Sequence, residues 1–232
     1  MIEEPPLLTV ARNPARLSPE RIAYFADAIT GWLADCMNGR GAMDAGIKPV
    51  APERPDMSRF VGSALPCRCG PDDNMALVAA VQLAQPGDVI VAATDGFTGS
   101  GMLGDLVAGM GRTKGVVAIV TDGAVRDRAG LLAVGLPVYS RALTPNSCVR
   151  SGPGTVGLPV IAGGLPVAAG DLVVGDADGV VVVPAGRIDE VAKRLVEVRA
   201  AEQRAEIRVA GGATTLPDVE AILASDRVRW VD

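Results

Sequence analysis

One stretch of the chain limits the choice of fold more than any other. The apolar run Val89–Ala93 is followed by a helical pattern over residues 102–112 and by a second apolar run over residues 115–120. Two buried strands joined by a helix form a βαβ unit, which requires parallel pairing and a right-handed crossover. The sequence therefore predicts an α/β fold with this unit at its centre.

Two further helices are predicted before the βαβ unit. Ser18 is a suitable N-cap, Pro19 suits the first helical position, and apolar residues follow at helical spacing to about residue 34. A second helical pattern runs from Asp73 to Gln85, and the turn Pro86-Gly87-Asp88 ends it. We therefore expect one helix over residues 18–34 and another over residues 73–85.

The pattern changes after the βαβ unit. Short apolar runs separated by Gly, Pro and Asp predict strands of a further β layer, at residues 136–140, 158–162, 172–175 and 179–183. From Ala185 to about Val209, charged and apolar residues alternate at helical spacing. This long helix exceeds what one small core needs, so we expect its far end to reach a neighbouring subunit.

Length and composition indicate a single domain that spans residues 1–232. No apolar run approaches the roughly 18 residues of a membrane span, and the acidic start of the chain does not resemble a secretory signal, so we expect a cytoplasmic protein. The formal net charge of −5 gives the chain no general attraction for nucleic acid. Small molecules or other proteins are the expected partners.

The chain contains no histidine, which excludes serine–histidine and cysteine–histidine catalysis and histidine-bound zinc. Its cysteines lack paired zinc-type spacing and are interpreted as reduced thiols: Cys36, Cys67, Cys69 and Cys148. A Schiff-base enzyme would need one of three lysines to be buried, and none is in a convincing position: Lys48, Lys114 and Lys193.

Carboxylates and arginines are therefore the main candidates for chemistry. They gather in the βαβ unit and the loop that leaves it: Asp95, Asp105, Asp122, Arg126, Asp127 and Arg128. The ends of parallel strands are where such folds bind ligands, and an arginine beside an aspartate suits an oxo acid with Mg²⁺. Local ion pairs on a surface loop would give the same pattern. Asp105 favours the functional interpretation, because it opens a helix whose Leu106 and Val107 amides could hold an oxygen anion.

A second interpretation of the same region is dinucleotide binding. Gly99, Gly101 and Gly104 match G-x-G-x-x-G, with Asp122 about 20 residues beyond. Residues 94–98 separate the strand from the first glycine, where this fingerprint requires an abrupt turn, and Asp105 would repel a pyrophosphate. We therefore expect no NAD(P) binding.

The sequence resembles the class II pyruvate aldolases, which cleave 4-hydroxy-4-methyl-2-oxoglutarate and 4-carboxy-4-hydroxy-2-oxoadipate, and the related regulator-of-ribonuclease-activity A (RraA-like) proteins. The motif Gly104-Asp105-Leu106-Val107 and the pair Arg126-Asp127, with twenty residues between Asp105 and Arg126, carry this resemblance. Residues 86–91, 121–127, 135–140 and 170–184 match as well, and the similarity spans roughly residues 20–210.

The resemblance implies a layered β/β/α, swivelling-domain-like fold in a homotrimer or a pair of trimers. It implies that Asp127 binds Mg²⁺ or Mn²⁺, that Arg126 contacts the oxo acid, and that Asp105 supports the metal through water. Gly104, Leu106 and Val107 would form the substrate-binding turn. Glu202, on the long helix of a neighbouring subunit, would complete the catalytic set, with Glu197 and Glu206 as alternatives one turn away.

The implied activity is metal-dependent release of pyruvate from a 4-hydroxy-2-oxo dicarboxylic or tricarboxylic acid, with oxaloacetate decarboxylation as a related reaction. Each reaction leaves electrons on a pyruvate enolate, which a divalent ion stabilises as a Lewis acid. The alternative is a non-catalytic protein that regulates ribonuclease activity by contact. Glu202 separates the two, because the catalytic set is incomplete if that carboxylate does not enter a neighbour's cleft.

Overall fold

The computed structural model describes residues 3–231, and its main sheet is built around the predicted βαβ unit. Strand β4 (Asp88–Ala93) pairs in parallel with β5 (Ala118–Thr121), and α4 (Asp105–Thr113) connects them. Both strands are buried along their whole length, as expected for Val- and Ile-rich strands covered on two faces. The sheet has nine strands; the others are β1 (Leu8–Val10), β2 (Lys48–Pro49), β3 (Phe60–Arg68), β7 (Val138–Ser140), β9 (Gly154–Val156), β12 (Leu172–Asp176) and β13 (Gly179–Val183).

Strand β3 is the branch point of this sheet, and the sequence pattern did not reveal it. One of its sides pairs with β4 over six residues. On the other side its first half pairs with β12 and its last two residues pair with β9. Proline cannot donate to a sheet ladder, and Pro66 lies between these two partners, where the ladder on that side is interrupted.

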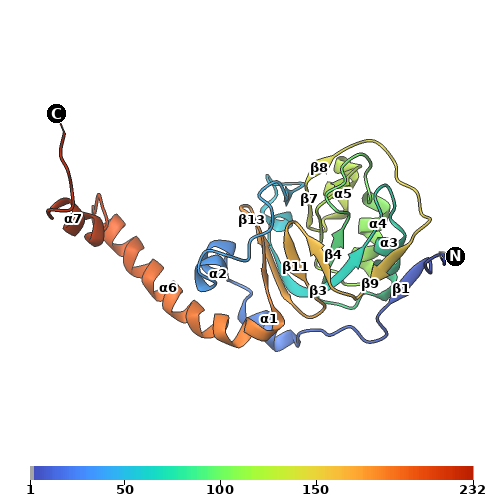
Figure 1. The fold of residues 1–232 in the computed structure, drawn as a ribbon, viewed down its shortest axis with the longest axis horizontal. Coiled ribbons are helices and arrows are strands. Elements are labelled where there is room, and N and C mark those ends of the chain that lie inside the picture. Colours follow the sequence, from blue (N-terminus) through green and yellow to red (C-terminus); the bar gives the residue numbers. More distant parts are fainter. Residues whose placement is uncertain (1–2, 232) are drawn as a thin grey trace.

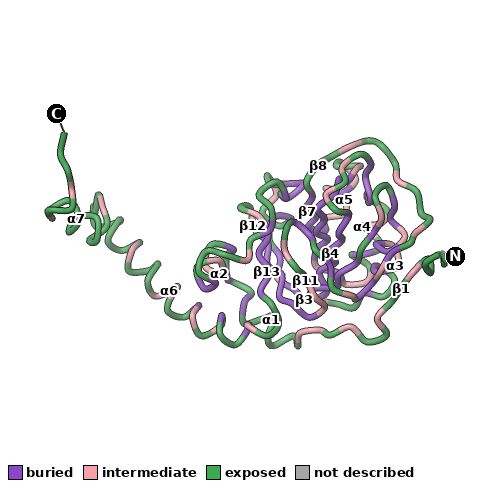
Figure 2. The backbone as a smooth tube through the Cα atoms, viewed as in Figure 1, coloured by how far each residue is buried: buried purple, intermediate pink, exposed green. Residues whose placement is uncertain are grey.

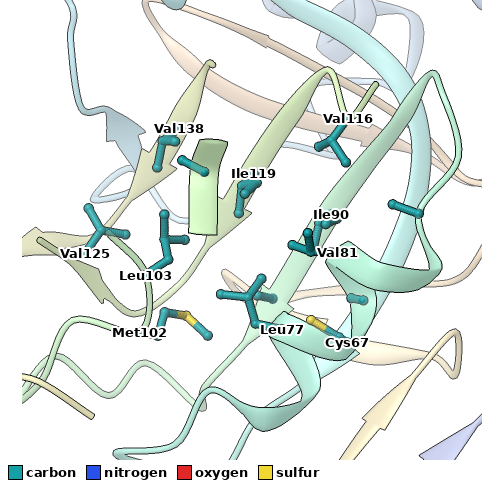
Figure 3. Packing of buried hydrophobic residues seen from close by; sticks show 14 of the residues in the cluster. Cys67, Leu77, Val81, Ile90, Met102, Leu103, Val116, Ile119, Val125 and Val138 are labelled. Atoms are coloured by element: carbon teal, nitrogen blue, oxygen red, sulfur yellow. The ribbon is translucent and has the colours of Figure 1, made fainter. Parts of the chain in front are cut away.

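Three helices cover one face of the sheet: α3 (Met75–Leu83), α4 and α5 (Arg128–Val134). Leu77 of α3 is fully buried against the sheet residues Ile90 and Ile119. Figure 3 shows that Met102 and Leu103 join the same cluster. The helix predicted over residues 102–112 begins later, at Asp105, because Met102 and Leu103 lie before the helix and are buried in the core.

The opposite face is covered by a hairpin of β10 (Val160–Ala162) and β11 (Leu165–Val167), which forms its own two-stranded sheet. Beneath it, Phe60 and Tyr139 pack edge to face with ring centroids 5.2 Å apart. These layers confirm the predicted α/β fold with its β/β/α arrangement. The assignment of every later strand to a separate layer was wrong, because β7, β12 and β13 are hydrogen-bonded into the main sheet. A short parallel pair of strands, β6 (Ala124–Val125) and β8 (Ala142–Leu143), follows the ends of β5 and β7.

The single helix predicted over residues 18–34 is wrong. The chain forms α1 (Pro19–Tyr24), capped by Ser18 as expected, and a separate α2 (Thr30–Cys36). Asp176 explains the break, because its carboxylate accepts from the backbone and the hydroxyl of Thr30 at 2.7 and 2.8 Å and so starts a new helix there. The described part also contains two short 3₁₀ turns, Pro55–Met57 and Ala185–Arg187.

The predicted long helix is confirmed as α6 (Ile188–Ala210), which ends near a short α7 (Pro217–Leu223). Its first three turns are held by the core, through the buried Ile188, Val191 and Leu195 and through Val198, which packs against the same cluster. At 1.5 Å per residue the helix is about 35 Å long, and Figure 1 shows it leaving the body on the side away from α4 and α5. Figure 2 shows that most of the projecting part of α6 and α7, which is called the arm below, is exposed. Within residues 3–231, no helix has the length and apolar character to cross a membrane.

A buried ion pair holds the segment before α1 against the sheet. Asp88, at the start of β4, is 1% exposed and binds Arg16 through three contacts of 2.9 to 3.1 Å. The same carboxylate accepts from the Gln85 amide at 2.9 Å and so also fixes the turn into β4. Removing one partner of a buried pair leaves the other charge uncompensated.

We therefore predict that Asp88→Asn lowers the free energy of unfolding by about 3 kcal/mol, the lower end of the range for buried pairs. Urea denaturation followed by circular dichroism measures this effect. Asp56→Asn, which removes an exposed pair with Arg54, is the matched control and should leave the midpoint nearly unchanged. Equal shifts in the two variants would contradict this role of Asp88.

Candidate active site

A cavity of about 320 Å³ lies beyond the carboxyl ends of β4 and β5. It is enclosed by the segment that leads into α4, the first turns of α4, the exit of β6 and the loop that follows β8. Its lining includes every residue that was predicted for one chain's half of the site: Gly104, Asp105, Leu106, Val107, Arg126 and Asp127. The loops after parallel strands thus converge here, as expected for a ligand site in this type of sheet.

Asp127 is held in an uncommon backbone conformation. Its φ of 58° lies in the left-handed region, where it serves as the residue before α5. Gly104 approaches it so closely that a Cβ at this position would lie 2.2 Å from Asp127 Oδ2. The glycine therefore leaves space directly at the carboxylate, whose side chain is 41% exposed.

Arg126 is fixed by its backbone and by both ends of its guanidinium group. Its amide donates to Leu103 O at 2.9 Å, which joins the strand exit to the segment before α4. Its Nε lies 3.1 Å from Asp127 Oδ2, and its Nη1 donates to Ser147 Oγ. The local ion pair that the alternative interpretation required is therefore present, but it lines a cavity and does not lie on an open surface loop.

The N-terminus of α4 supplies the third side of the cavity. Asp105 packs against α5, since a Cβ on Gly130 would lie 2.3 Å from Asp105 Oδ2. The first intrahelical bond runs from Ala108 N to Gly104 O, so the amides of Leu106 and Val107 precede it. The Leu106 amide donates a hydrogen bond of 2.8 Å to the carboxylate of Asp105. An incoming anion would therefore compete with Asp105 for Leu106, whereas Val107 has no such competitor among the bonds of the described chain.

Three members of the predicted charged cluster lie outside the cavity. Asp95 pairs with Arg68, and Arg128 pairs with Glu53. Asp122 is buried and accepts from the Thr94 amide at 2.7 Å, so it secures the end of β4 and is not free to bind a ribose. None of the three lysines lines the cavity.

The structure does not bring Glu202 to the cavity of its own chain. Glu202 is exposed on the projecting part of α6, as are Glu197 and Glu206. Because α6 leaves the body on the side away from α4 and α5, none of these carboxylates lines the cavity of the same chain (Figure 1).

Sequence reasoning missed four polar residues of the lining, which are Asn74, Ser147, Cys148 and Arg150. Three of them lie on the loop between β8 and β9, which follows no periodic pattern that could have pointed to it. Burial raises the pKa of the Cys148 thiol, so this side chain is neutral at pH 7 and a poor nucleophile. All four cysteines are free, as expected.

The residues at Asp127 fit a hard divalent cation. Carboxylate oxygens are the ligands that Mg²⁺ and Mn²⁺ prefer, and Gly104 keeps the space at Asp127 Oδ2 clear. Within residues 3–231 no three His, Cys, Asp or Glu side chains gather in a metal-binding arrangement. A cation held by Asp127 would therefore take its other ligands from water, from substrate or from another chain.

The chain is similar in sequence and in structure to several known proteins. The chain is 34% identical over 185 residues to a protein of Halalkalibacterium halodurans named "Putative 4-hydroxy-4-methyl-2-oxoglutarate aldolase", which covers 80% of this chain and 86% of that protein. An uncharacterized protein from Pseudomonas syringae pv. tomato has a similar structure, with a TM-score of 0.74, 25% identity, and coverage of 86% of this chain and 96% of that one.

Another solved structure comes from Streptomyces coelicolor and is described as an unusual member of the RNase ES inhibitor RraA protein family. It has a TM-score of 0.73 and 27% identity, and it covers 83% of this chain and all of that one. The family model named RraA-like, Aldolase/RraA, matches residues 25–182, which include the whole cavity. The protein therefore belongs to the RraA-like family.

Proposed function

We propose that the protein is a divalent-metal-dependent lyase that releases pyruvate from a 4-hydroxy-2-oxo acid. The observation that carries this proposal is the convergence of Asp105, Arg126 and Asp127 on one cavity, in a chain without histidine. The aldolase name of the Halalkalibacterium relative supports the same reaction class. Decarboxylation of oxaloacetate, which breaks the equivalent bond, is proposed as a related activity.

In the proposed reaction the C3–C4 bond of the substrate breaks. The 4-hydroxyl group loses its proton and becomes the carbonyl of one product, and the bonding electrons pass to C3 and form the enolate of pyruvate. Protonation at C3 then gives pyruvate. A Mg²⁺ or Mn²⁺ ion held by Asp127 would supply Lewis-acid polarisation of the 2-oxo group.

The chain's own residues orient the substrate and balance its charge. Arg126 can face the carboxylate and the 2-oxo group with its planar fork, because Ser147 and Asp127 already fix its direction. The Val107 amide offers a further donor at the positive end of α4. Asp105, half-buried between α4 and α5, is placed to hold a water that accepts the hydroxyl proton.

We propose that the second support of this water is Glu202 from a neighbouring copy in a homotrimer or a pair of trimers. The supporting observation is the arm itself, which exposes large apolar side chains along α6 and α7: Val196, Ile207, Val209, Leu216, Ile222 and Leu223. Apolar surface of this extent on a projecting arm is typical of a protein–protein contact. Glu197 and Glu206 are the alternatives on the same helix.

A non-catalytic regulator of ribonuclease activity is the second candidate. The likeness to the Streptomyces inhibitor-family protein favours it. The two functions differ in a direct observable, because a regulator that acts by contact releases no pyruvate at any metal concentration.

We predict that pyruvate release from oxaloacetate and from 4-hydroxy-4-methyl-2-oxoglutarate requires added Mg²⁺ or Mn²⁺. EDTA should abolish it, because a cation bound by few carboxylates exchanges readily. A coupled lactate dehydrogenase assay measures the product, and excess Mg²⁺ should restore activity. Full activity in EDTA, with a lysine adduct trapped by borohydride, would contradict the metal-dependent mechanism.

We also predict that Arg126→Ala lowers kcat by about 10² or more, as does loss of other preorganised charge stabilisers. Arg126→Lys should restore little, because an ammonium group cannot form the two-pronged contact with a carboxylate. Steady-state pyruvate release at saturating Mg²⁺ measures both variants. The melting temperature should stay close to that of the wild type, since the Arg126 side chain is 39% exposed. Near-wild-type turnover in Arg126→Ala would exclude a catalytic role.

A further inference from the structure

The cavity contains a second arginine that the proposed mechanism does not use. Arg150 lies on the loop between β8 and β9 and lines the cavity together with Arg126. Arg126 has Asp127 beside it, whereas no carboxylate of residues 3–231 forms an ion pair with Arg150. Arg150 is thus a cation with no anionic partner at the mouth of a substrate-sized cavity.

The loop holds Arg150 in a fixed place. On one side Val149 exchanges backbone hydrogen bonds with the segment before α3, to Asp72 at 2.8 Å and from Asn74 at 3.1 Å. On the other side the amides of Ser151 and Gly152 donate to the buried carboxylate of Asp73. The backbone of Arg150 is therefore anchored at both neighbours, which reduces the entropy that binding would cost.

A buried amide also directs the Arg150 side chain. Asn74 is 6% exposed; its Nδ2 donates to Met102 O at 2.9 Å, and its Oδ1 accepts from Arg150 Nε at 3.1 Å. One edge of the guanidinium group is used in this bond. The N–H groups on its two terminal nitrogens stay available, and this pair matches the two oxygens of a carboxylate.

We propose that Arg150 binds a second carboxylate of the substrate, at the end remote from the 2-oxo acid, and so selects dianionic over monoanionic 2-oxo acids. This inference rests on the proposed function, in which Arg126 binds the oxo-acid end. The two cavity carboxylates, Asp105 and Asp127, would both serve the cation, so each arginine is left to face one carboxylate of the substrate.

The test compares two ligands that differ only at the remote end. 2-Oxoglutarate carries a carboxylate where 2-oxopentanoate carries a methyl group. Calorimetry with Mg²⁺ present should show that wild type prefers 2-oxoglutarate and that Arg150→Gln raises its Kd about 10- to 100-fold, as expected for loss of a charge-assisted pair. The Kd for 2-oxopentanoate should change by less than about twofold, since a methyl group makes no such pair. Arg150→Lys should give an intermediate loss for 2-oxoglutarate.

Arg112→Gln is the matched control, because Arg112 lies at the far end of α4 and does not line the cavity. It should leave both affinities unchanged. Equal weakening of both ligands by Arg150→Gln would overturn the inference, since it is the result expected if Arg150 only shapes the loop or pairs with a neighbour's Glu202. No change for either ligand would overturn it as well.

The outcomes also separate this inference from the proposed function. If wild type releases no pyruvate yet Arg150→Gln selectively loses 2-oxoglutarate, the proposed reaction fails and the second carboxylate site stands. If wild type releases pyruvate and the variant shows no selective loss, only the role of Arg150 fails.

Discussion

The site depends on the close packing of two helix starts, α4 and α5, beyond the ends of two parallel strands. Gly104 and Gly130 allow this packing, because a Cβ at either position would collide with Asp127 or Asp105. The backbone bond from Arg126 to Leu103 then joins the two segments. Since Leu103 is itself buried in the core, the position of the charged residues is set by the same packing that stabilises the sheet and its helices.

Features encoded by local pattern could be predicted from the sequence. Val89–Ala93 and the helix after it predict the βαβ unit without knowledge of the rest of the chain. The positions of Asp105 and of Arg126-Asp127 follow from it, because Asp105 begins the helix of that unit and Arg126-Asp127 lies in the loop that leaves its second strand. A carboxylate just after a strand is nonetheless ambiguous, because Asp122 directly follows β5 but accepts from the Thr94 amide and lies outside the cavity.

Features set by distant contacts could not be predicted. Strand β3 contains a proline and changes partners along its length, so its role depends on segments about 100 residues away. The break between α1 and α2 depends on Asp176, and Arg150 reaches the cavity through Asn74, 76 residues earlier. The surroundings of Glu202 depend on more than one chain. Because α6 carries Glu202 away from the cavity of its own chain, any role in catalysis requires a second copy.

We propose that cleavage occurs in a site shared by two copies of the chain, with Arg126 from one copy and Glu202 from the other. Subunit mixing tests this claim most directly. Arg126→Ala and Glu202→Gln chains, co-expressed with different tags and purified as mixed assemblies, should regain pyruvate release that each variant alone has largely lost. In a trimer that contains both variants, one of the three interfaces has both halves intact, so the purified mixed trimers should recover about a third of wild-type activity. Mixed assemblies that stay as inactive as the separate variants would contradict the shared site.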